Sequence, residues 1–202
     1  MGNLPTPEPI DQQMAQASLH QDSRRVVWAQ RLRRADLAAV HLISRSARPK
    51  IGRISAIAIS RLGNSWLYLI IVPVIFGGLG REGFRVVFLG ALNAGLLHLM
   101  YPIIKRKIGR PRPYQVDPKL QSLAAVLDEH SFPSGHTMTL SGVLTPIVLV
   151  WPGAILSAVA LLLLMAWSRI ATAHHYPSDT FAGAILGIVL AYPLSILVLA
   201  LW

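Results

Sequence analysis

The sequence contains no cysteine among its 202 residues. Disulfide bonds, zinc sites built on thiolates and cysteine nucleophiles are therefore excluded. Charged residues are also scarce, at 14% of the chain, whereas hydrophobic residues make up 53%. A chain of this length has room for one compact domain, and the excess of apolar residues indicates that lipid rather than water surrounds it.

Acidic residues are few, because nine Asp and Glu stand against nineteen Lys and Arg, and the formal net charge is +10. In a soluble protein this excess would suggest a nucleic-acid partner, but the basic residues lie mostly outside the long apolar runs. We therefore expect no nucleic acid, and anionic lipid headgroups as the counterpart. The first residues also lack the basic start and apolar core of a cleavable secretory signal, so insertion is expected to depend on later segments.

The chain divides into three parts by composition. Residues 1–22 are rich in Pro, Gln and acidic residues and poor in large apolar ones, which predicts disorder. In residues 23–62 arginines recur among Val, Trp, Leu and Ile, a pattern typical of an amphipathic helix on a membrane surface, with a solvated basic linker as the alternative. Residues 63–202 are expected to form a transmembrane domain.

Five apolar stretches follow residue 62, and several are short for a hydrocarbon core of about 30 Å, so that their ends must extend into flanking polar residues. The stretches are 66–80, 84–104, 137–150, 154–167 and 180–202. The expected fold is all-α, an integral membrane bundle of about five transmembrane helices with an N-terminal amphipathic surface helix. Small residues such as Gly90, Gly95, Gly183 and Gly187 are expected to let the helices approach closely.

Three polar segments interrupt the apolar pattern, at 105–113, 132–136 and 168–179. The first follows the second span, the next opens the third span, and the last joins the fourth span to the fifth. In a bundle of alternating spans all three therefore lie on the same side of the membrane and can build one site. Residues 119–129, between the first two segments, form either a surface helix or a plain connector.

The first segment, KRKIGRPRP, places Lys105 and Arg112 seven residues apart. Its Gly and Pro residues should end the helix and turn the chain across the mouth of the bundle, so that two cations face one place. Taken alone, such a segment is more often a basic flank that anchors a helix to lipid headgroups.

The second segment, FPSGH, stands directly before an apolar helix, where unpaired backbone N–H groups and the positive helix end favour an anion. Ser134 adds a hydroxyl donor and Gly135 permits close approach of the backbone. His136, at the rim, can give a proton to a leaving oxygen if its pKa lies near the working pH. The plain alternative is a capping or interfacial histidine.

The third segment, SRIATAHHYPSD, offers the planar fork of Arg169 to phosphate oxygens. His175 precedes Asp179 by four residues, a spacing at which a carboxylate can hold one imidazole tautomer. The imidazole could then attack phosphorus while Asp179 stabilises the positive ring. His174 competes for this role, and only its spacing to Asp179 disfavours it. The alternative is an interfacial salt-bridged pair.

Phosphoryl transfer asks a protein mainly for positioning and for charge stabilisation on three equatorial oxygens. Lys105, Arg112, Arg169 and the amides of residues 134–135 can supply both. No metal ion and no cofactor are therefore expected.

Together the three segments resemble the signature of the type 2 phosphatidic acid phosphatase and vanadium haloperoxidase superfamily. The signature is Lys, six residues, Arg-Pro; then Pro-Ser-Gly-His; then Ser-Arg, five residues, His, three residues, Asp. Order and spacing agree throughout, from residue 64 or so to the C-terminus. The matching positions are Lys105, Arg112, Pro113, Pro133, Ser134, Gly135, His136, Ser168, Arg169, His175 and Asp179.

By similarity to this superfamily, His175 would be the nucleophile, His136 the acid for the leaving alcohol and Asp179 the residue that orients His175. The phosphate cradle implied by the resemblance consists of Lys105, Arg112, Ser134, Gly135 and Arg169.

The resemblance implies a metal-independent lipid phosphatase that forms a phosphohistidine. Its substrate would be a phosphate monoester or diphosphate of a membrane lipid: a polyprenyl phosphate derivative, phosphatidic acid or phosphatidylglycerol phosphate. A lipid phosphotransferase with the same intermediate and a non-enzymatic protein that binds anionic lipid are the alternatives. Oxidation with bound vanadate is disfavoured, because the haloperoxidases are soluble.

Membrane members of the superfamily commonly have six spans, but the region before Trp66 is too rich in arginine to cross. The usual first span is therefore expected to be missing, which places the N-terminus on the side of the motifs. That side carries seventeen Lys and Arg, against Arg81 and Arg85 on the other. By the positive-inside tendency we expect a cytoplasmic active site in a multi-pass protein of the bacterial cytoplasmic membrane.

Overall fold

The computed structural model describes residues 27–28, 30–64, 66–126 and 128–202. It divides into two units, residues 1–38 and 39–202. In the first unit, residues 27–28 and 30–38 are described, and they are helical. The disorder predicted for residues 1–22 lies outside the described residues, as does the start of the basic segment 23–62.

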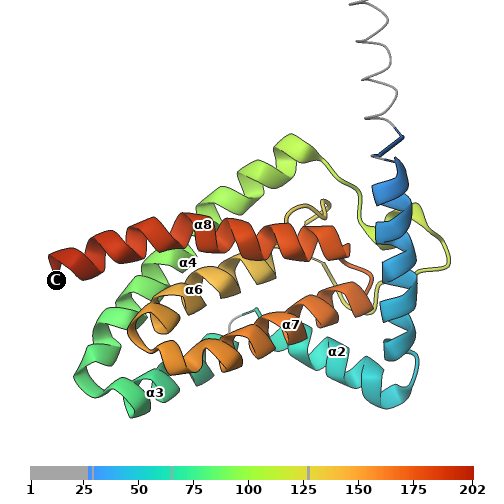
Figure 1. The fold of residues 1–202 in the computed structure, drawn as a ribbon. Helices are drawn as coiled ribbons and strands as arrows, with labels where there is room; N and C mark the ends of the chain where they lie inside the picture. Colours follow the sequence, from blue (N-terminus) through green and yellow to red (C-terminus); the bar gives the residue numbers. More distant parts are fainter. Residues whose placement is uncertain (1–26, 29, 65, 127) are drawn as a thin grey trace, which may run out of the picture. The chain divides into compact units, whose positions relative to one another are not determined.

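The second unit is built from helices (Figure 1). Helical residues 39–44 lead into a 3-10 turn, η1 (Arg45–Ala47). The helices that follow are α2 (Lys50–Leu62), α3 (Trp66–Leu79), α4 (Gly83–Ile108), α5 (Pro113–Val116), α6 (Gly135–Val150), α7 (Ile155–Ala171) and α8 (Pro177–Leu201). The 3-10 turns η2 (Gly80–Glu82) and η3 (Pro152–Ala154) join α3 to α4 and α6 to α7. No strand forms among the described residues, and the all-α prediction is confirmed.

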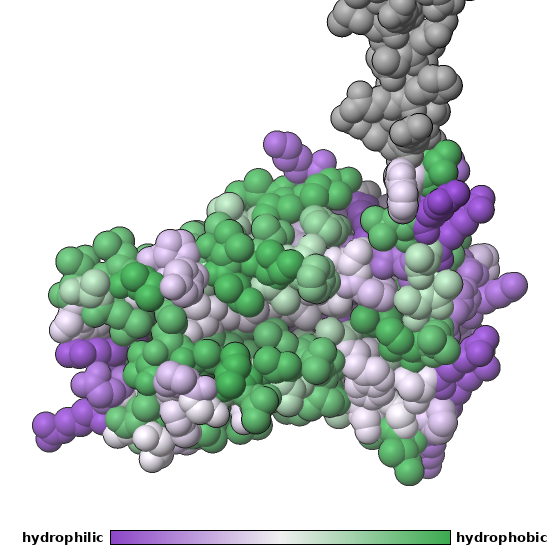
Figure 2. Space-filling model, in the orientation of Figure 1, coloured by the Kyte–Doolittle hydropathy of each residue, from purple (hydrophilic) through white to green (hydrophobic). Residues whose placement is uncertain are grey.

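The five predicted apolar stretches become α3, α4, α6, α7 and α8. Within the described part of the chain, three segments are long and apolar enough to cross a membrane: Trp66–Ile108, Pro152–Ala171 and Pro177–Leu201. The first of these contains both α3 and α4. Helix α6 is shorter, since its 16 residues rise only about 24 Å. Apolar side chains gather over α7 and α8 on the face drawn in Figure 2, as expected for helices that face lipid.

Helix α6 lies at the centre of the unit, between α4 and α8 (Figure 1). Every residue from Thr137 to Ile147 is buried. Helix α8 approaches it closely at Gly187, where an added Cβ would lie 2.2 Å from the carbonyl oxygen of Met138. The predicted role of Gly183 and Gly187 in close packing is confirmed. For Gly95 the prediction is wrong, because no atom lies within 4 Å of a Cβ built there.

The three polar segments come together at one end of the bundle. The C-terminal ends of α4 and α7 meet the N-terminal ends of α6 and α8 there (Figure 1). Helix α4 ends as predicted, at Gly109, whose φ of 63° is the left-handed conformation that glycine adopts without strain. A surface helix over 119–129 is wrong, because the described residues of that segment form a connector without helix.

Candidate functional site

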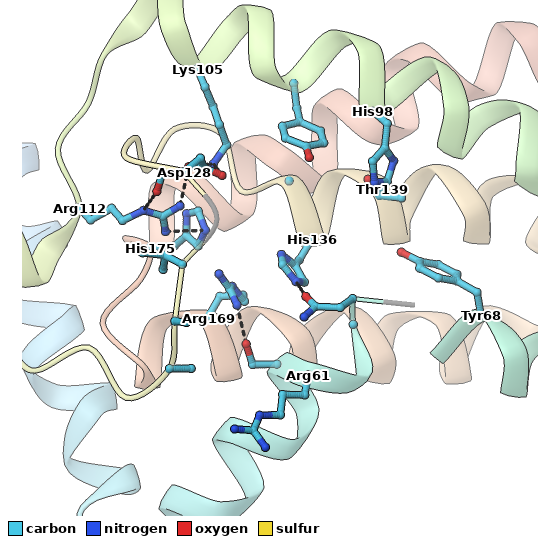
Figure 3. Close-up of a pocket in the computed structure, with 18 residues that line it drawn as sticks. Arg61, Tyr68, His98, Lys105, Arg112, Asp128, His136, Thr139, Arg169 and His175 are labelled. Carbon is cyan, nitrogen blue, oxygen red and sulfur yellow. Dashed lines mark hydrogen bonds and ion pairs between the residues drawn. The ribbon is translucent and has the colours of Figure 1, made fainter. Parts of the chain in front are cut away.

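A cavity of about 530 Å³ opens where the polar segments meet (Figure 3). Its walls come from α2, α3, α4, α6, α7 and the loops at this end of the bundle. Among the residues predicted for the site, those that line the cavity are Lys105, Arg112, Gly135, His136, Arg169 and His175. Ser134 and Asp179 are fully buried and hold the surrounding backbone, as described below.

Lys105 and Arg112 share one counter-charge, Asp128. The Lys105 ammonium lies 2.9 Å from Asp128 Oδ1, and Arg112 Nη2 lies 2.6 Å from the same oxygen. Both cations are almost fully buried, whereas 39% of the Asp128 side chain is exposed. Burial opposes ionisation of this carboxyl, but the hydrogen bond and charge of Lys105 and the charge of Arg112 lower its pKa overall. The connector 119–129 thus supplies a carboxylate that holds two predicted phosphate ligands in place.

The ring of His175 is fixed by a backbone carbonyl. Its Nδ1–H donates to the Ser131 carbonyl oxygen at 2.7 Å. A carbonyl can only accept, so this bond places the hydrogen on Nδ1 and leaves the lone pair on Nε2. Arg112 Nη1 lies 3.4 Å from Nε2. Nε2, which carries the lone pair, therefore faces the guanidinium of Arg112.

Contacts between the first polar segment and the residues just before the second segment place the Ser131 carbonyl. The Ser131 amide donates to the Arg110 carbonyl at 2.8 Å, and Pro111 and His130 form an isolated antiparallel bridge. The chain after α4 therefore positions the group that orients His175, far away in the sequence.

Burial, followed by the charges of Arg169 and Arg112, holds the pKa of His175 well below its usual range. The same causes lower the pKa of His174 to about 3. Both rings are therefore neutral near pH 7, and geometry rather than pKa separates them. His174 Nε2 donates to the Ala124 carbonyl at 3.0 Å, so its ring faces the connector, while His175 lines the cavity.

Asp179 ties the second polar segment to the third. Its Oδ2 accepts the Tyr176 amide at 2.9 Å, and its backbone carbonyl accepts the Ser134 amide at 3.0 Å. Arg110 donates to Oδ1 at 2.7 Å. The distance from Oδ2 to His175 Nδ1 is 3.7 Å, which is long for a hydrogen bond but short enough for attraction to a positive ring.

Two residues predicted for the phosphate cradle have a buried donor with no partner among the described residues: the Ser134 hydroxyl and Arg169 Nε. Arg169 also donates through Nη1 to Ser60 of α2. Buried polar groups are almost always hydrogen-bonded, so unpaired donors in these residues suit an anionic ligand. The Ser134 amide, in contrast to our expectation for the 134–135 amides, is already bonded to Asp179.

His136 lies between the cations and the far part of the cavity (Figure 3). Its Nε2 lies 2.7 Å from Asn64 Oδ1, in the turn between α2 and α3. Burial, followed by the charges of Arg169 and Lys105, holds the pKa of His136 well below its usual range, so the pKa near the working pH that an acid role requires is not met without an anion beside the ring.

In the part of the chain that the structure describes, no three His, Asp or Glu side chains are grouped so that they could hold a metal ion. The cavity is instead lined by cationic side chains.

Sequence reasoning did not single out Asp128, Ser131 or Arg110. The only sequence signal for Asp128 was the small number of acidic residues, since buried cations need a counter-charge and few Asp and Glu are available. Ser131 acts through its backbone, which no residue type reveals. Arg110 lies inside the first motif, but its partner Asp179 is 69 residues away.

Comparisons with known proteins agree with this architecture. The family model described as PAP2 superfamily matches residues 84–202, more than half of the chain. Two similar solved structures are a transmembrane PAP2-type phosphatidylglycerolphosphate phosphatase from Bacillus subtilis and LpxE from Aquifex aeolicus. The first has a TM-score of 0.58 and 25% identity, over 80% of this chain and 83% of that one. The second has a TM-score of 0.62 and 23% identity, over 79% and 93%, and supports the fold alone.

Curated relatives are similar over shorter parts. A lipid A 1-phosphatase of Rhizobium johnstonii is 32% identical over 108 residues, covering 52% of this chain and 41% of the relative. A lipid A 1-phosphatase of Rhizobium etli is 25% identical over 144 residues, covering 61% of each. The chain thus spans less than two thirds of the length of either relative. The family match and the helical membrane architecture together show that this chain belongs to the PAP2 superfamily.

Proposed function

We propose that this chain is a membrane lipid phosphatase that hydrolyses a phosphate monoester or diphosphate through a phosphohistidine intermediate on His175. The observation that carries the proposal is the fixed, neutral His175, whose Nε2 lies 3.4 Å from Arg112 Nη1 in a cavity that the buried cations Lys105 and Arg169 also line. Relatives named as lipid A 1-phosphatases and a phosphatidylglycerolphosphate phosphatase support a lipid phosphate as substrate. Polyprenyl phosphates and phosphatidic acid are further candidates.

The first step forms the intermediate. The phosphate oxygens bind Lys105, Arg112, Arg169 and the Ser134 hydroxyl, and the Nε2 lone pair of His175 attacks phosphorus. The N–P bond forms as the P–O ester bond breaks. The electron pair leaves on the ester oxygen, which takes a proton from His136. The negative charge of the bound phosphate offsets the neighbouring cations and stabilises the imidazolium form of His136 that this step requires.

The second step releases phosphate. Neutral His136 takes a proton from water, whose oxygen bonds to phosphorus, and the electron pair of the N–P bond returns to Nε2 of His175. Between the two steps the ring of His175 is positive. The Ser131 carbonyl accepts its Nδ1 hydrogen, and the Asp179 carboxylate at 3.7 Å stabilises the charge.

A substrate panel tests the proposal. Purified protein in detergent should release phosphate from at least one of phosphatidic acid, phosphatidylglycerol phosphate, lipid A and polyprenyl mono- and diphosphates. We expect the rate to be unchanged by EDTA, because cationic side chains supply the charge stabilisation, and to fall with orthovanadate, which resembles phosphate.

Two outcomes would contradict parts of the proposal. A rate abolished by EDTA and restored by magnesium would refute metal independence. Transfer of phosphate to an added alcohol, without release to water, would make the protein a phosphotransferase.

We further propose that the site opens to the cytoplasmic side of a bacterial cytoplasmic membrane, on the strength of the basic residues at the motif end. The absence of cysteine permits a clean test. Lys107→Cys, at the exposed end of α4, should resist a membrane-impermeant maleimide in spheroplasts and react after lysis. The matched variant Arg81→Cys, exposed in η2, should react in intact spheroplasts. The reverse pattern would place the site on the outer face.

A further inference from the structure

The cavity continues beyond the phosphate cradle. Figure 3 shows Tyr68, His98 and Thr139 on the far side of His136 from Arg112 and His175. They come from α3, α4 and α6, and all three line the cavity.

Thr139 differs from the other hydroxyl residues of its helix. Thr137, Ser141 and Thr145 each donate to a backbone carbonyl three or four residues earlier in the chain. The Thr139 hydroxyl is buried, with 3% of the residue exposed, and has no partner among the described residues. A buried hydroxyl without a hydrogen bond is costly, and an apolar residue of the same shape would avoid that cost.

His98 also presents a nitrogen beyond its own helix. Its Nδ1 donates to the Ala94 carbonyl at 2.9 Å, which leaves Nε2 for another group. The Tyr68 phenol and the Thr139 hydroxyl add further donors and acceptors at this end of the cavity. The charged lining residues lie elsewhere: Lys105, Arg112, Asp128 and Arg169 are on the other side of His136 in Figure 3, and Arg61 belongs to α2. The end formed by Tyr68, His98 and Thr139 therefore suits hydroxyl and carbonyl groups better than a second phosphate.

The order of groups along the cavity matches the order of atoms in a phosphate ester. Phosphorus would lie at the cations, the ester oxygen at His136, and the alcohol beyond His136. We propose that Tyr68, His98 and Thr139 form a headgroup subsite that binds the hydroxyl groups of the alcohol, so that lipids with a sugar or glycerol next to the phosphate are preferred over a bare polyprenyl chain. This proposal rests on the proposed phosphatase function.

The test is a change in selectivity. We would measure kcat/KM of wild type and Thr139→Val with phosphatidylglycerol phosphate, lipid A and farnesyl phosphate in mixed micelles. Loss of one hydrogen bond should lower kcat/KM about threefold to tenfold for a lipid whose hydroxyls reach the subsite. The value for farnesyl phosphate should change by less than about twofold, because that alcohol has no hydroxyl to bind. A loss confined to lipid A identifies a sugar, and a loss confined to phosphatidylglycerol phosphate identifies glycerol.

Matched variants complete the experiment. Thr145→Val removes a hydroxyl of the same helix that is already bonded to the Ser141 carbonyl, and should leave the substrate ratio unchanged. Thr139→Ser keeps the hydroxyl and should retain the ratio, whereas Tyr68→Phe should shift it in the direction of Thr139→Val. Since the ratio is measured within one preparation, a smaller folded fraction does not affect it.

Failure of the subsite and failure of the phosphatase function give different results. A wild type that turns over these lipids with a ratio unaltered in both Thr139→Val and Tyr68→Phe overturns the subsite alone. A wild type that releases phosphate only from phosphatidic acid or polyprenyl phosphates also overturns the subsite alone. A wild type that releases phosphate from no lipid of the full panel overturns the phosphatase function, and the subsite with it.

Discussion

Alanine at position 175 should abolish phosphate release, with a residual rate at or below the detection limit. The ring of His175 is the group proposed to bond to phosphorus, and neither Ser131 nor Asp179 can replace a nucleophile that they only orient or stabilise. The measurement is single-turnover phosphate release from the best substrate of the panel. In the wild type, quenching during turnover of radiolabelled substrate should trap protein-bound phosphate that is labile in acid and stable in alkali, as expected for a phosphohistidine.

His174→Ala is the matched control for this experiment. It removes an adjacent, buried imidazole of low pKa whose ring bonds to the connector at Ala124. Its backbone carbonyl, which accepts Arg112 Nη1 at 2.8 Å, is retained. We expect this variant to keep turning over and to form the trapped intermediate. Trapping in His175→Ala, or its loss in His174→Ala alone, would assign the nucleophile to the other histidine.

Arg112→Ala should lower kcat/KM at least about a hundredfold, as expected when a charge-stabilising donor is lost. The guanidinium of Arg112 lies 3.4 Å from Nε2 of His175 and also bonds to Asp128 and to the His174 carbonyl. Its removal is therefore expected to take away a proposed phosphate ligand and to loosen the backbone that carries His175. Steady-state kinetics should show the lower kcat/KM. Orthovanadate should inhibit the variant less strongly than the wild type.

Two further variants separate these contributions. Arg106→Ala removes an exposed arginine near the C-terminal end of α4. This variant should keep kcat/KM within about twofold of wild type, since an exposed charge contributes little. Arg112→Lys restores the charge but not the planar fork, so only part of the loss should be recovered. Wild-type kcat/KM in Arg112→Ala, in protein that elutes as folded, would remove Arg112 from the phosphate cradle.

The long apolar runs allowed the helical fold to be predicted from the sequence. Each of the five stretches became a helix, because in lipid a helix is the structure in which one segment satisfies its own backbone hydrogen bonds. The number of crossings is less well determined by the pattern, since α6 is short and the segment 66–108 contains two helices. Packing of glycines was predictable at Gly187 but not at Gly95, because a small residue does not reveal which side of its helix meets a neighbour.

The motifs allowed the site to be located, because six residues named from spacing line one cavity. Their roles stay predictions, to be tested by the variants above. His175 was preferred over His174 for its spacing to Asp179, yet the hydrogen-bond acceptor of its Nδ1 is the Ser131 carbonyl. Sequence could not show this, since the acceptor is a backbone atom 44 residues away.

The amino-acid sequence by itself determined the helical membrane class, the end of the bundle at which the polar segments gather, and the residue types available for phosphate chemistry. These follow from local properties: hydrophobic run length, helix-ending Gly and Pro, and charge. Only the tertiary structure decided that Asp128 holds Lys105 and Arg112, that Asp179 bonds to the Ser134 amide, and that the Thr139 hydroxyl lacks a partner among the described residues. Hydrogen bonds and ion pairs act over about 3 Å, so which distant groups satisfy one another depends on how the helices pack.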